Sequence, residues 1–436
     1  MALRILSIDG GGIRGVIPAY WLSQLETRLG SLQSKFDVFA GTSTGAIIAA
    51  GLACGLTAAQ IYHLYRTSGP EIFRRKKLWR FLPSLRASCG LRPKYGREGL
   101  DRVLLNTFQE RTLADITPGK RLIIVALDAY NRRQVVFDSE ESDYGHHRLR
   151  DLCRASAAAP TYFPPHALPA QGIVVPFLDG GLAGNNPSTV ALARALRSGL
   201  GLNEVLLVSL GTGSVHETID APKVTQQVEK RGWLTWASPL IDLLFDGSSA
   251  INDDVSASIL GSDYFRFQVR LPKNLGALDD VRSTHLENLV AEARNYWNAA
   301  KSQVDNLVKA LSDEGTLTGS WRSTFTWGRS VSPRLAVAGV RFDESRSGEV
   351  RVRQFGSIIS GESVDPKGSP DQYTFKGSLR GDDIIGEWKS QHTALCGTFQ
   401  LRRDIETPNK VCSGFWSGTG AEGLYVGTWT LERAGS

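Results

Sequence analysis

Cysteine is scarce in this sequence of 436 residues, and long uninterrupted apolar runs are missing. The five cysteines are odd in number and share no CxxC spacing, which argues against a disulfide framework or a zinc ribbon and fits a reducing cytosol. No stretch reaches about eighteen consecutive apolar residues, so we expect no membrane-spanning helix. The apolar run after Met1 is too short for the core of a signal peptide. The sequence therefore predicts a cytoplasmic protein that contacts the inner membrane only peripherally.

Histidine is scarce as well, with seven in the chain, and none lies in the sequence context of a Ser-His-Asp triad. His166 follows a proline-rich turn and is the nearest candidate, but we expect a structural role for it. No cluster of His, Asp, Glu or Cys shows metal-ligand spacing. The sequence thus predicts neither a metal nor another cofactor.

The composition that remains is that of a folded protein, with 42% hydrophobic and 22% charged residues. Up to about residue 270, short strands rich in Ile, Val and Leu alternate with amphipathic helices. This pattern predicts a layered α/β domain with a mostly parallel sheet, which we place at residues 1–313. A long helix over residues 280–311 closes it. The expected strands are Leu3–Ile8, Val38–Ala40, Leu122–Leu127, Ile173–Leu178 and Val205–Leu210.

After Gly315 the helical period disappears, and short alternating strands predict a small all-β barrel or sandwich at residues 316–436. This second domain shows no nucleophile, metal cluster or phosphate loop, so we expect a binding or regulatory module. Its tryptophans could line a ligand-binding mouth or fill the core: Trp321, Trp327, Trp388, Trp416 and Trp429. The expected strands are 318–327, 336–342, 349–355, 372–379, 384–388, 397–402, 411–416 and 423–431.

A glycine-rich loop, Gly10-Gly11-Gly12-Ile13-Arg14-Gly15, directly follows the first strand and precedes a helix. Dinucleotide-binding proteins share this GxGxxG spacing, but they carry an acidic residue at the end of their second strand. Here Asp37 precedes its strand, which argues against a nucleotide cofactor at this loop. We expect the amides of Gly11 and Gly12, with Gly10 and Arg14 beside them, to form an oxyanion hole.

A second motif, Gly41-Thr42-Ser43-Thr44-Gly45, lies between the second strand and an apolar helix. GxSxG at such a junction is typical of a nucleophile elbow, in which glycines on both sides allow the serine to occupy a strained turn. The alternative is a structural turn serine. The third motif is Asp179-Gly180-Gly181, after the strand Ile173–Leu178. Because we expect that strand to run parallel to its neighbours, Asp179 at its carboxyl end should lie at the same sheet edge as Ser43 and act as its base; alone, it would indicate a turn or cap.

These three motifs, in this order, resemble the patatin-like phospholipase family. The stretch Ala155–Pro165 and Asn185-Asn186-Pro187 also look like that family, and the resemblance covers roughly residues 1–310. It implies a three-layer α/β/α fold and hydrolysis of lipid acyl esters through an acyl-enzyme, with Ser43 as nucleophile and Asp179 as base. The competing hypotheses are a serine esterase or peptidase, an acyltransferase, and a non-enzymatic scaffold that retains the fold.

Two partners are expected. Between Arg74 and Arg97 lie nine basic residues and no acidic one, interleaved with aromatic and aliphatic side chains, which suits an anionic phospholipid membrane; a solvated loop and nucleic-acid binding are the alternatives. A further apolar stretch, Gly232–Phe245, is expected to be a buried core helix or a lid. The resemblance extends to membrane-degrading effectors of bacterial antiphage defence, and this implies that the second domain senses a cyclic nucleotide, or a lipid. We also expect a homo-oligomer.

Overall fold

The computed structural model describes residues 3–74, 93–170, 172–197, 201–215, 237–312, 319–330, 344–355, 358–364, 372–380, 382–391, 396–404, 411–420 and 423–433. The chain divides into two compact units, Leu3–Val308 and Lys309–Ser436. Each unit is described by itself. None of the helices in the described parts of the chain is long and apolar enough to cross a bilayer.

The first unit is built on a sheet in the order β5-β6-β3-β2-β1-β7-β9, with β4 also paired to β3. Strands β1, β2, β3, β7 and β9 pair with one another in parallel. Every pair that includes β4, β5 or β6 is antiparallel. The strands are β1 (Leu3–Ile8), β2 (Val38–Thr42), β3 (Arg121–Asp128), β4 (Arg133–Asp138), β5 (His166–Ala170), β6 (Ile173–Asp179), β7 (Val205–Leu210) and β9 (Tyr264–Phe267).

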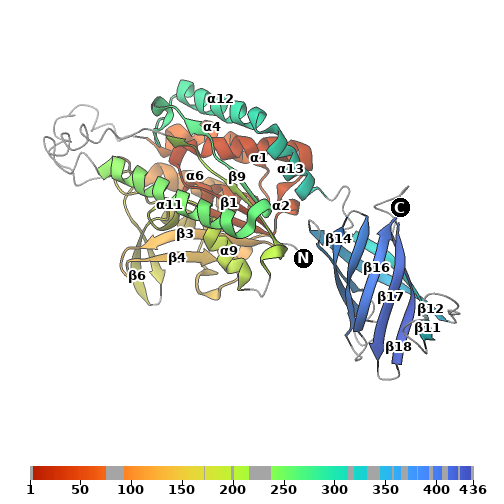
Figure 1. Cartoon of the computed structure of the whole chain (residues 1–436). Helices are drawn as coiled ribbons and strands as arrows, with labels where there is room; N and C mark the ends of the chain where they lie inside the picture. Colours follow the sequence, from red (N-terminus) through yellow and green to blue (C-terminus); the bar gives the residue numbers. More distant parts are fainter. Residues whose placement is uncertain are drawn as a thin grey trace, which may run out of the picture. The chain divides into compact units, whose positions relative to one another are not determined.

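Helices cover both faces of this sheet, which confirms the three-layer arrangement (Figure 1). On one face Trp21 of α1 packs against Phe267 of β9 and donates to the carbonyl of Ala293 in α12. On the other face α9 and the end of α11 pack on alternate residues of the central strands, such as Ile5 and Leu207. The helices are α1 (Val16–Leu29), α3 (Thr44–Ala53), α4 (Ala58–Ile72), α6 (Glu98–Phe108), α7 (Leu149–Ser156), α8 (Gly181–Gly184), α9 (Ser188–Leu196), α11 (Ala237–Leu260), α12 (Ser283–Ala299) and α13 (Lys301–Leu311).

Strand β6 differs from the prediction because it runs antiparallel to β3. Both β2 and β6 pair with β3, β2 along Arg121–Val125 and β6 along Ala126–Asp128. Since β4 occupies the other edge of β3, β2 and β6 share one edge and meet end to end. The ends that meet are Thr42 and Asp179, opposite Val125 and Ala126.

The second unit contains a closed antiparallel barrel in which each strand pairs with the next and β18 pairs with β11. Trp321 and Trp429 lie inside it with other apolar side chains and are fully buried, while Trp388 and Trp416 pack against this core. The strands are β11 (Gly319–Ser330), β12 (Glu344–Phe355), β13 (Ile358–Ser363), β14 (Tyr373–Arg380), β15 (Asp383–Ser390), β16 (Cys396–Arg403), β17 (Val411–Gly420) and β18 (Gly423–Arg433).

Several local predictions need correction or lie outside the described residues. The strand Ile358–Ser363 was not predicted, and the strand expected over 336–342 lies outside the described residues. The single helix expected over 280–311 is two helices, α12 and α13, that meet at Ala300. His166 begins strand β5 rather than lying in a loop. The side chain of Trp327 also lies outside the described residues.

Candidate active site

Ser43 occupies the sharp turn between β2 and α3, with φ 55° and ψ −120°. This left-handed conformation is strained for a residue with a Cβ, and it is what a nucleophile elbow requires. The flanking glycines are needed for close packing. A Cβ at Gly41 would lie 2.2 Å from the carbonyl oxygen of Gly45, and one at Gly45 would lie 2.1 Å from that of Ile8. The turn therefore packs directly against the end of β1.

Ser156, at the end of α7, fixes the elbow from behind. The amide of Ser43 donates to Ser156 Oγ over 2.8 Å, and that hydroxyl donates to the carbonyl of Val125 over 2.6 Å. The carbonyl of Ser156 also accepts from the amide of Gly180. One serine thus links the elbow to the turn that follows β6. Its place in a run of small residues gave no signal of this role.

Asp179 reaches Ser43 from the opposing strand end. Ser43 Oγ donates to Asp179 Oδ2 over 2.7 Å, and the amide of Gly181 donates to Oδ1 over 2.7 Å. The carboxyl group is buried, and burial raises its pKa from 3.8 to about 7, against the lowering effect of the bonds from Ser43 and Gly181 and of the charge on Arg154. A carboxylate with this pKa is suited to general base catalysis near neutral pH.

The glycine-rich loop lies against the elbow. A Cβ at Gly10 would be 3.2 Å from Ser43 Cβ, and one at Gly12, where φ is +57°, would be 2.3 Å from the carbonyl oxygen of Leu278. Among the residues that the structure describes, the amides of Gly11 and Gly12 donate to no backbone acceptor. Gly12 also lines a cavity beside Ser43, whereas Gly11 does not. Arg14 lies in the 3-10 turn η1 (Gly12–Gly15) and is buried.

A cavity of about 60 Å³ opens beside Ser43 and Asp179. Gly12 contributes to its wall, and the remaining lining is mostly apolar: Ile13, Thr44, Ile47, Tyr65, Ile72, Phe73, Leu100, Ala157, Ala159, Tyr162, Phe163, Phe245 and Leu278. Drug-sized ligands occupy pockets of about 300–1,000 Å³. The cavity therefore suits the end of an acyl chain and must widen to admit a whole lipid.

Several predicted features lie outside the described residues or away from Ser43 and Asp179. Most of the basic segment between Arg74 and Arg97 lies outside the described residues, as do residues 232–236 of the apolar stretch. Phe245, the last residue of that stretch, is buried and lines the cavity. His166 Nε2 lies 3.6 Å from Asp151 Oδ1, and His166 does not line the cavity. Within the ranges described, no group of three His, Cys, Asp or Glu residues is placed to hold a metal ion.

Known proteins match this chain clearly. A family profile described as "Patatin-like phospholipase" matches residues 6–192. A "cGAMP-activated phospholipase" of Pseudomonas aeruginosa is 32% identical over 293 residues, covering 64% of this chain and 83% of that protein. "Patatin-like protein 2" of rice is 29% identical, covering 70% and 85%, and "Probable inactive patatin-3-Kuras 1" of potato is 28% identical, covering 69% and 88%. VipD from Legionella pneumophila has a similar structure with a TM-score of 0.40 and 13% identity, covering 70% of this chain and 67% of that chain.

The chain belongs to the patatin-like phospholipase family. It is a lipid acyl hydrolase with a mixed α/β patatin-like domain and an additional eight-stranded barrel.

Proposed function

We propose that the enzyme hydrolyses phospholipid acyl esters, as a phospholipase A, with Ser43 and Asp179 as its catalytic dyad. The hydrogen bond from Ser43 Oγ to Asp179 Oδ2 carries this proposal. Ionised Asp179 accepts the hydroxyl proton as Ser43 Oγ attacks the ester carbonyl carbon. The protonated carboxyl then gives that proton to the departing lysophospholipid oxygen. A water molecule, deprotonated by Asp179, attacks the acyl-enzyme, and Asp179 returns that proton to Ser43 Oγ as the fatty acid is released.

The developing oxyanion is stabilised by the glycine-rich loop. The amides of Gly11 and Gly12 have no competing backbone acceptor among the described residues, and Gly12 lines the cavity beside Ser43. Arg14 adds positive charge to the same loop. Loss of one oxyanion donor typically costs about a hundredfold or more in kcat.

The test compares Ser43→Ala and Asp179→Asn with Asp128→Asn. Asp128 is a matched control because it is also buried at the end of a sheet strand, yet its carboxylate accepts from Tyr130 and Asn131 and does not contact Ser43. We expect fatty acid release from phosphatidylglycerol and phosphatidylcholine vesicles to be lost in the first two variants and kept in Asp128→Asn. Full activity in Ser43→Ala or Asp179→Asn would refute the dyad.

A fluorophosphonate, which labels activated serines, separates the alternatives. Labelling at Ser43 without fatty acid release from either vesicle, both with and without added cyclic di- and trinucleotides, would point to a peptidase or to an acyltransferase. Absence of labelling in a folded protein would point to a scaffold that retains the fold. Release of fatty acid together with labelling at Ser43 supports the proposal.

We further propose that a cyclic nucleotide gates the hydrolase, as part of a defence system that degrades membranes. Its support is the cGAMP-activated relative and the small volume of the cavity. From the sequence we expect this ligand in the second domain, but two observations favour the first. Among the barrel residues that the structure describes, the core side chains around Trp321 enclose a cavity of about 10 Å³, about the volume that one water needs. About 60 residues of the relative lie outside the match, too few for a barrel of this length.

Activity of the full chain with and without cyclic di- and trinucleotides tests the gate. We expect little hydrolysis by the purified protein until one of these ligands is added. A photo-crosslinking cyclic dinucleotide then locates the site by peptide mapping. Crosslinks within Leu3–Val308 support the location proposed here, crosslinks within the barrel support the earlier prediction, and full activity without ligand contradicts gating.

Peripheral membrane binding through the basic segment and a homo-oligomer stay predictions. Vesicle sedimentation with and without phosphatidylglycerol tests the first, since binding through Lys and Arg must weaken with added salt. Binding that is absent or insensitive to salt would count against that segment. Light scattering of the purified chain measures the oligomeric state.

A further inference from the structure

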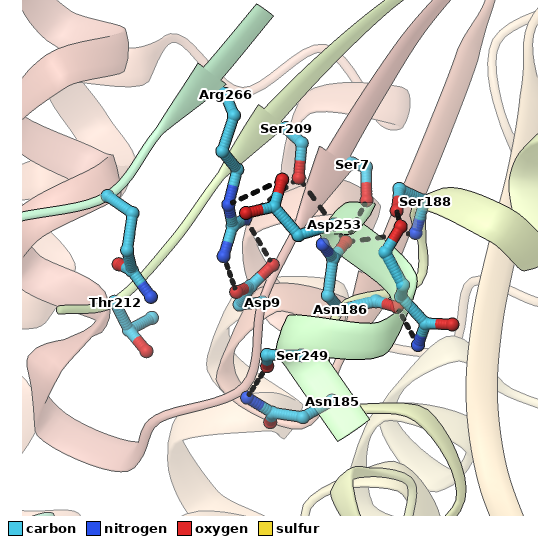
Figure 2. A network of polar contacts seen from close by, with 12 residues as sticks. Ser7, Asp9, Asn185, Asn186, Ser188, Ser209, Thr212, Ser249, Asp253 and Arg266 are labelled. Carbon is cyan, nitrogen blue, oxygen red and sulfur yellow. Dashed lines mark hydrogen bonds and ion pairs between the residues drawn. The ribbon is translucent and has the colours of Figure 1, made fainter. Parts of the chain in front are cut away.

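A polar network surrounds Asp9, the residue that directly precedes the glycine-rich loop (Figure 2). At its centre Asp9 meets Arg266 of β9. Arg266 Nη1 donates to Asp9 Oδ1 over 2.9 Å, and Nη2 donates to Oδ2 over 2.6 Å. Burial alone would lower the pKa of Arg266, but the Asp9 carboxylate outweighs it and raises that pKa. Burial raises the pKa of Asp9 against the lowering effect of Arg266. The mechanism proposed above uses neither residue.

The register of the sheet explains how Arg266 reaches Asp9 across an intervening strand. Ser7 of β1 is opposite Ser209 of β7, which is opposite Arg266 of β9. The guanidinium also donates to Ser209 Oγ over 2.8 Å. The position of the Arg266 guanidinium is therefore set by β9 and β7, and the guanidinium holds Asp9 just beyond the carboxyl end of β1.

The loop itself is held on both sides of the proposed oxyanion amides. The carbonyl of Gly10 accepts from Thr212 Oγ1 over 2.5 Å, and its amide donates to the carbonyl of Asn185 over 3.1 Å. Beyond the amides, Ile13 donates to the carbonyl of Leu278 over 2.9 Å. The amides of Gly11 and Gly12 lie between these anchors, so their direction depends on where Asp9 and Gly10 are held.

We propose that Arg266 is a positioning residue for catalysis, which aims the oxyanion amides by fixing Asp9. The inference rests on the function proposed above. A displacement of about 1 Å in catalytic geometry costs on the order of a hundredfold in rate. A role limited to folding would instead leave the rate per folded molecule unchanged.

The molecule contains a matched pair for comparison. Arg121 Nε and Nη2 donate to Asp138 Oδ1 and Oδ2 over 2.9 and 2.7 Å, in an equally buried bidentate arrangement. Arg121 begins β3, so this pair lies at the sheet edge opposite the elbow. Substitution there disturbs a similar ion pair without touching the loop.

The experiment compares Arg266→Lys with Arg121→Lys in the full chain. Each variant is measured for its urea unfolding midpoint, for the rate at which a fluorophosphonate modifies Ser43, and for kcat and KM on a phospholipid. We expect both variants to unfold at lower urea. Only Arg266→Lys should lose about tenfold or more in the phosphonylation rate and in kcat, with KM unchanged, because the phosphonyl oxygen also needs the oxyanion amides.

Wild-type rates in Arg266→Lys, or equal losses in both variants, would overturn the proposal. If Arg266→Lys does not fold, the double variant Asp9→Asn with Arg266→Gln, which leaves no buried charge, is measured in the same way with the same expectation. Phosphonylation requires no lipid. If the wild type is labelled at Ser43 but releases no fatty acid even with cyclic di- and trinucleotides present, the phospholipase assignment fails while the role of Arg266 is still decided.

Discussion

Replacing the buried carboxyl of Asp179 by an amide should abolish activity and make the protein more stable at alkaline pH. The folded protein holds the pKa of this group at about 7, against 3.8 in its ordinary state, mainly because of burial. Between pH 3.8 and about pH 7, Asp179 therefore keeps a proton in the folded protein that it has released in the unfolded chain. The free energy of unfolding therefore falls as pH rises through this window and levels off above about pH 7.

The size of the effect follows from the same shift. One pKa unit corresponds to about 1.4 kcal/mol, so a shift of about three units makes ionised Asp179 cost roughly 4 kcal/mol in the folded protein at pH 8. About 2.5 kcal/mol of this should develop between pH 5 and pH 8. Asp179→Asn stays neutral and avoids the cost, so its advantage over the wild type should widen by that amount across this range.

Urea unfolding of both proteins at pH 5, 6, 7 and 8 measures the difference. Asp128→Asn is the control with the opposite sign, since burial favours its neutral form but the hydrogen bonds from Asn131 and Tyr130 outweigh burial and lower its pKa. That variant should lose stability at pH 8. Parallel curves of stability against pH for Asp179→Asn and the wild type would refute the assignment of a raised pKa to Asp179.

Three further outcomes are expected. In a pH–rate profile, kcat/KM should fall about tenfold per unit below pH 7, because protonated Asp179 cannot accept the proton of Ser43; a flat profile down to pH 5 would contradict this. Ser43→Gly and Ser43→Ala should both be inactive, yet thermal melts should show Ser43→Gly more stable by about 1 kcal/mol, since only the alanine keeps the strain at φ 55°. Ser156→Ala leaves the buried amide of Ser43 without its acceptor. The variant should therefore lose about 1–3 kcal/mol of unfolding free energy in urea and at least tenfold in kcat. A wild-type kcat would show that Ser156 does not hold the elbow.

The elements of the first unit were largely predictable because buried strands and amphipathic helices leave strong local patterns. The direction of β6 was not, because a short apolar strand has the same composition in either direction. The turn that reverses the chain is marked by Gly172, at φ +80°, between β5 and β6. The expected strand β6 did bring Asp179 to Ser43, but through an end-to-end meeting rather than through parallel strands.

In the second unit the missed strand Ile358–Ser363 contains Gly361, which lowers strand propensity. A Cβ there would lie 2.3 Å from the ring of Phe375, so the glycine makes room for a core side chain contributed by the next strand. Such a requirement appears only once the barrel is formed. Arg266 and Thr212 were missed for a similar reason, since neither belongs to a motif and each contacts the loop from more than 200 residues away in sequence.

Strand β3 sets the distance between the nucleophile and its base, because β2, which leads to Ser43, and β6, which ends at Asp179, both pair with it. Asp179 follows Ser43 by 136 positions in sequence, yet Thr42 and Asp179 lie opposite adjacent residues of β3. Segments inserted between them can lengthen or change without moving the reacting atoms, provided that they leave the β3 pairings intact. This arrangement leaves evolution free to alter the outer wall of the cavity, and so the choice of lipid, while the distance between hydroxyl and carboxylate stays constant.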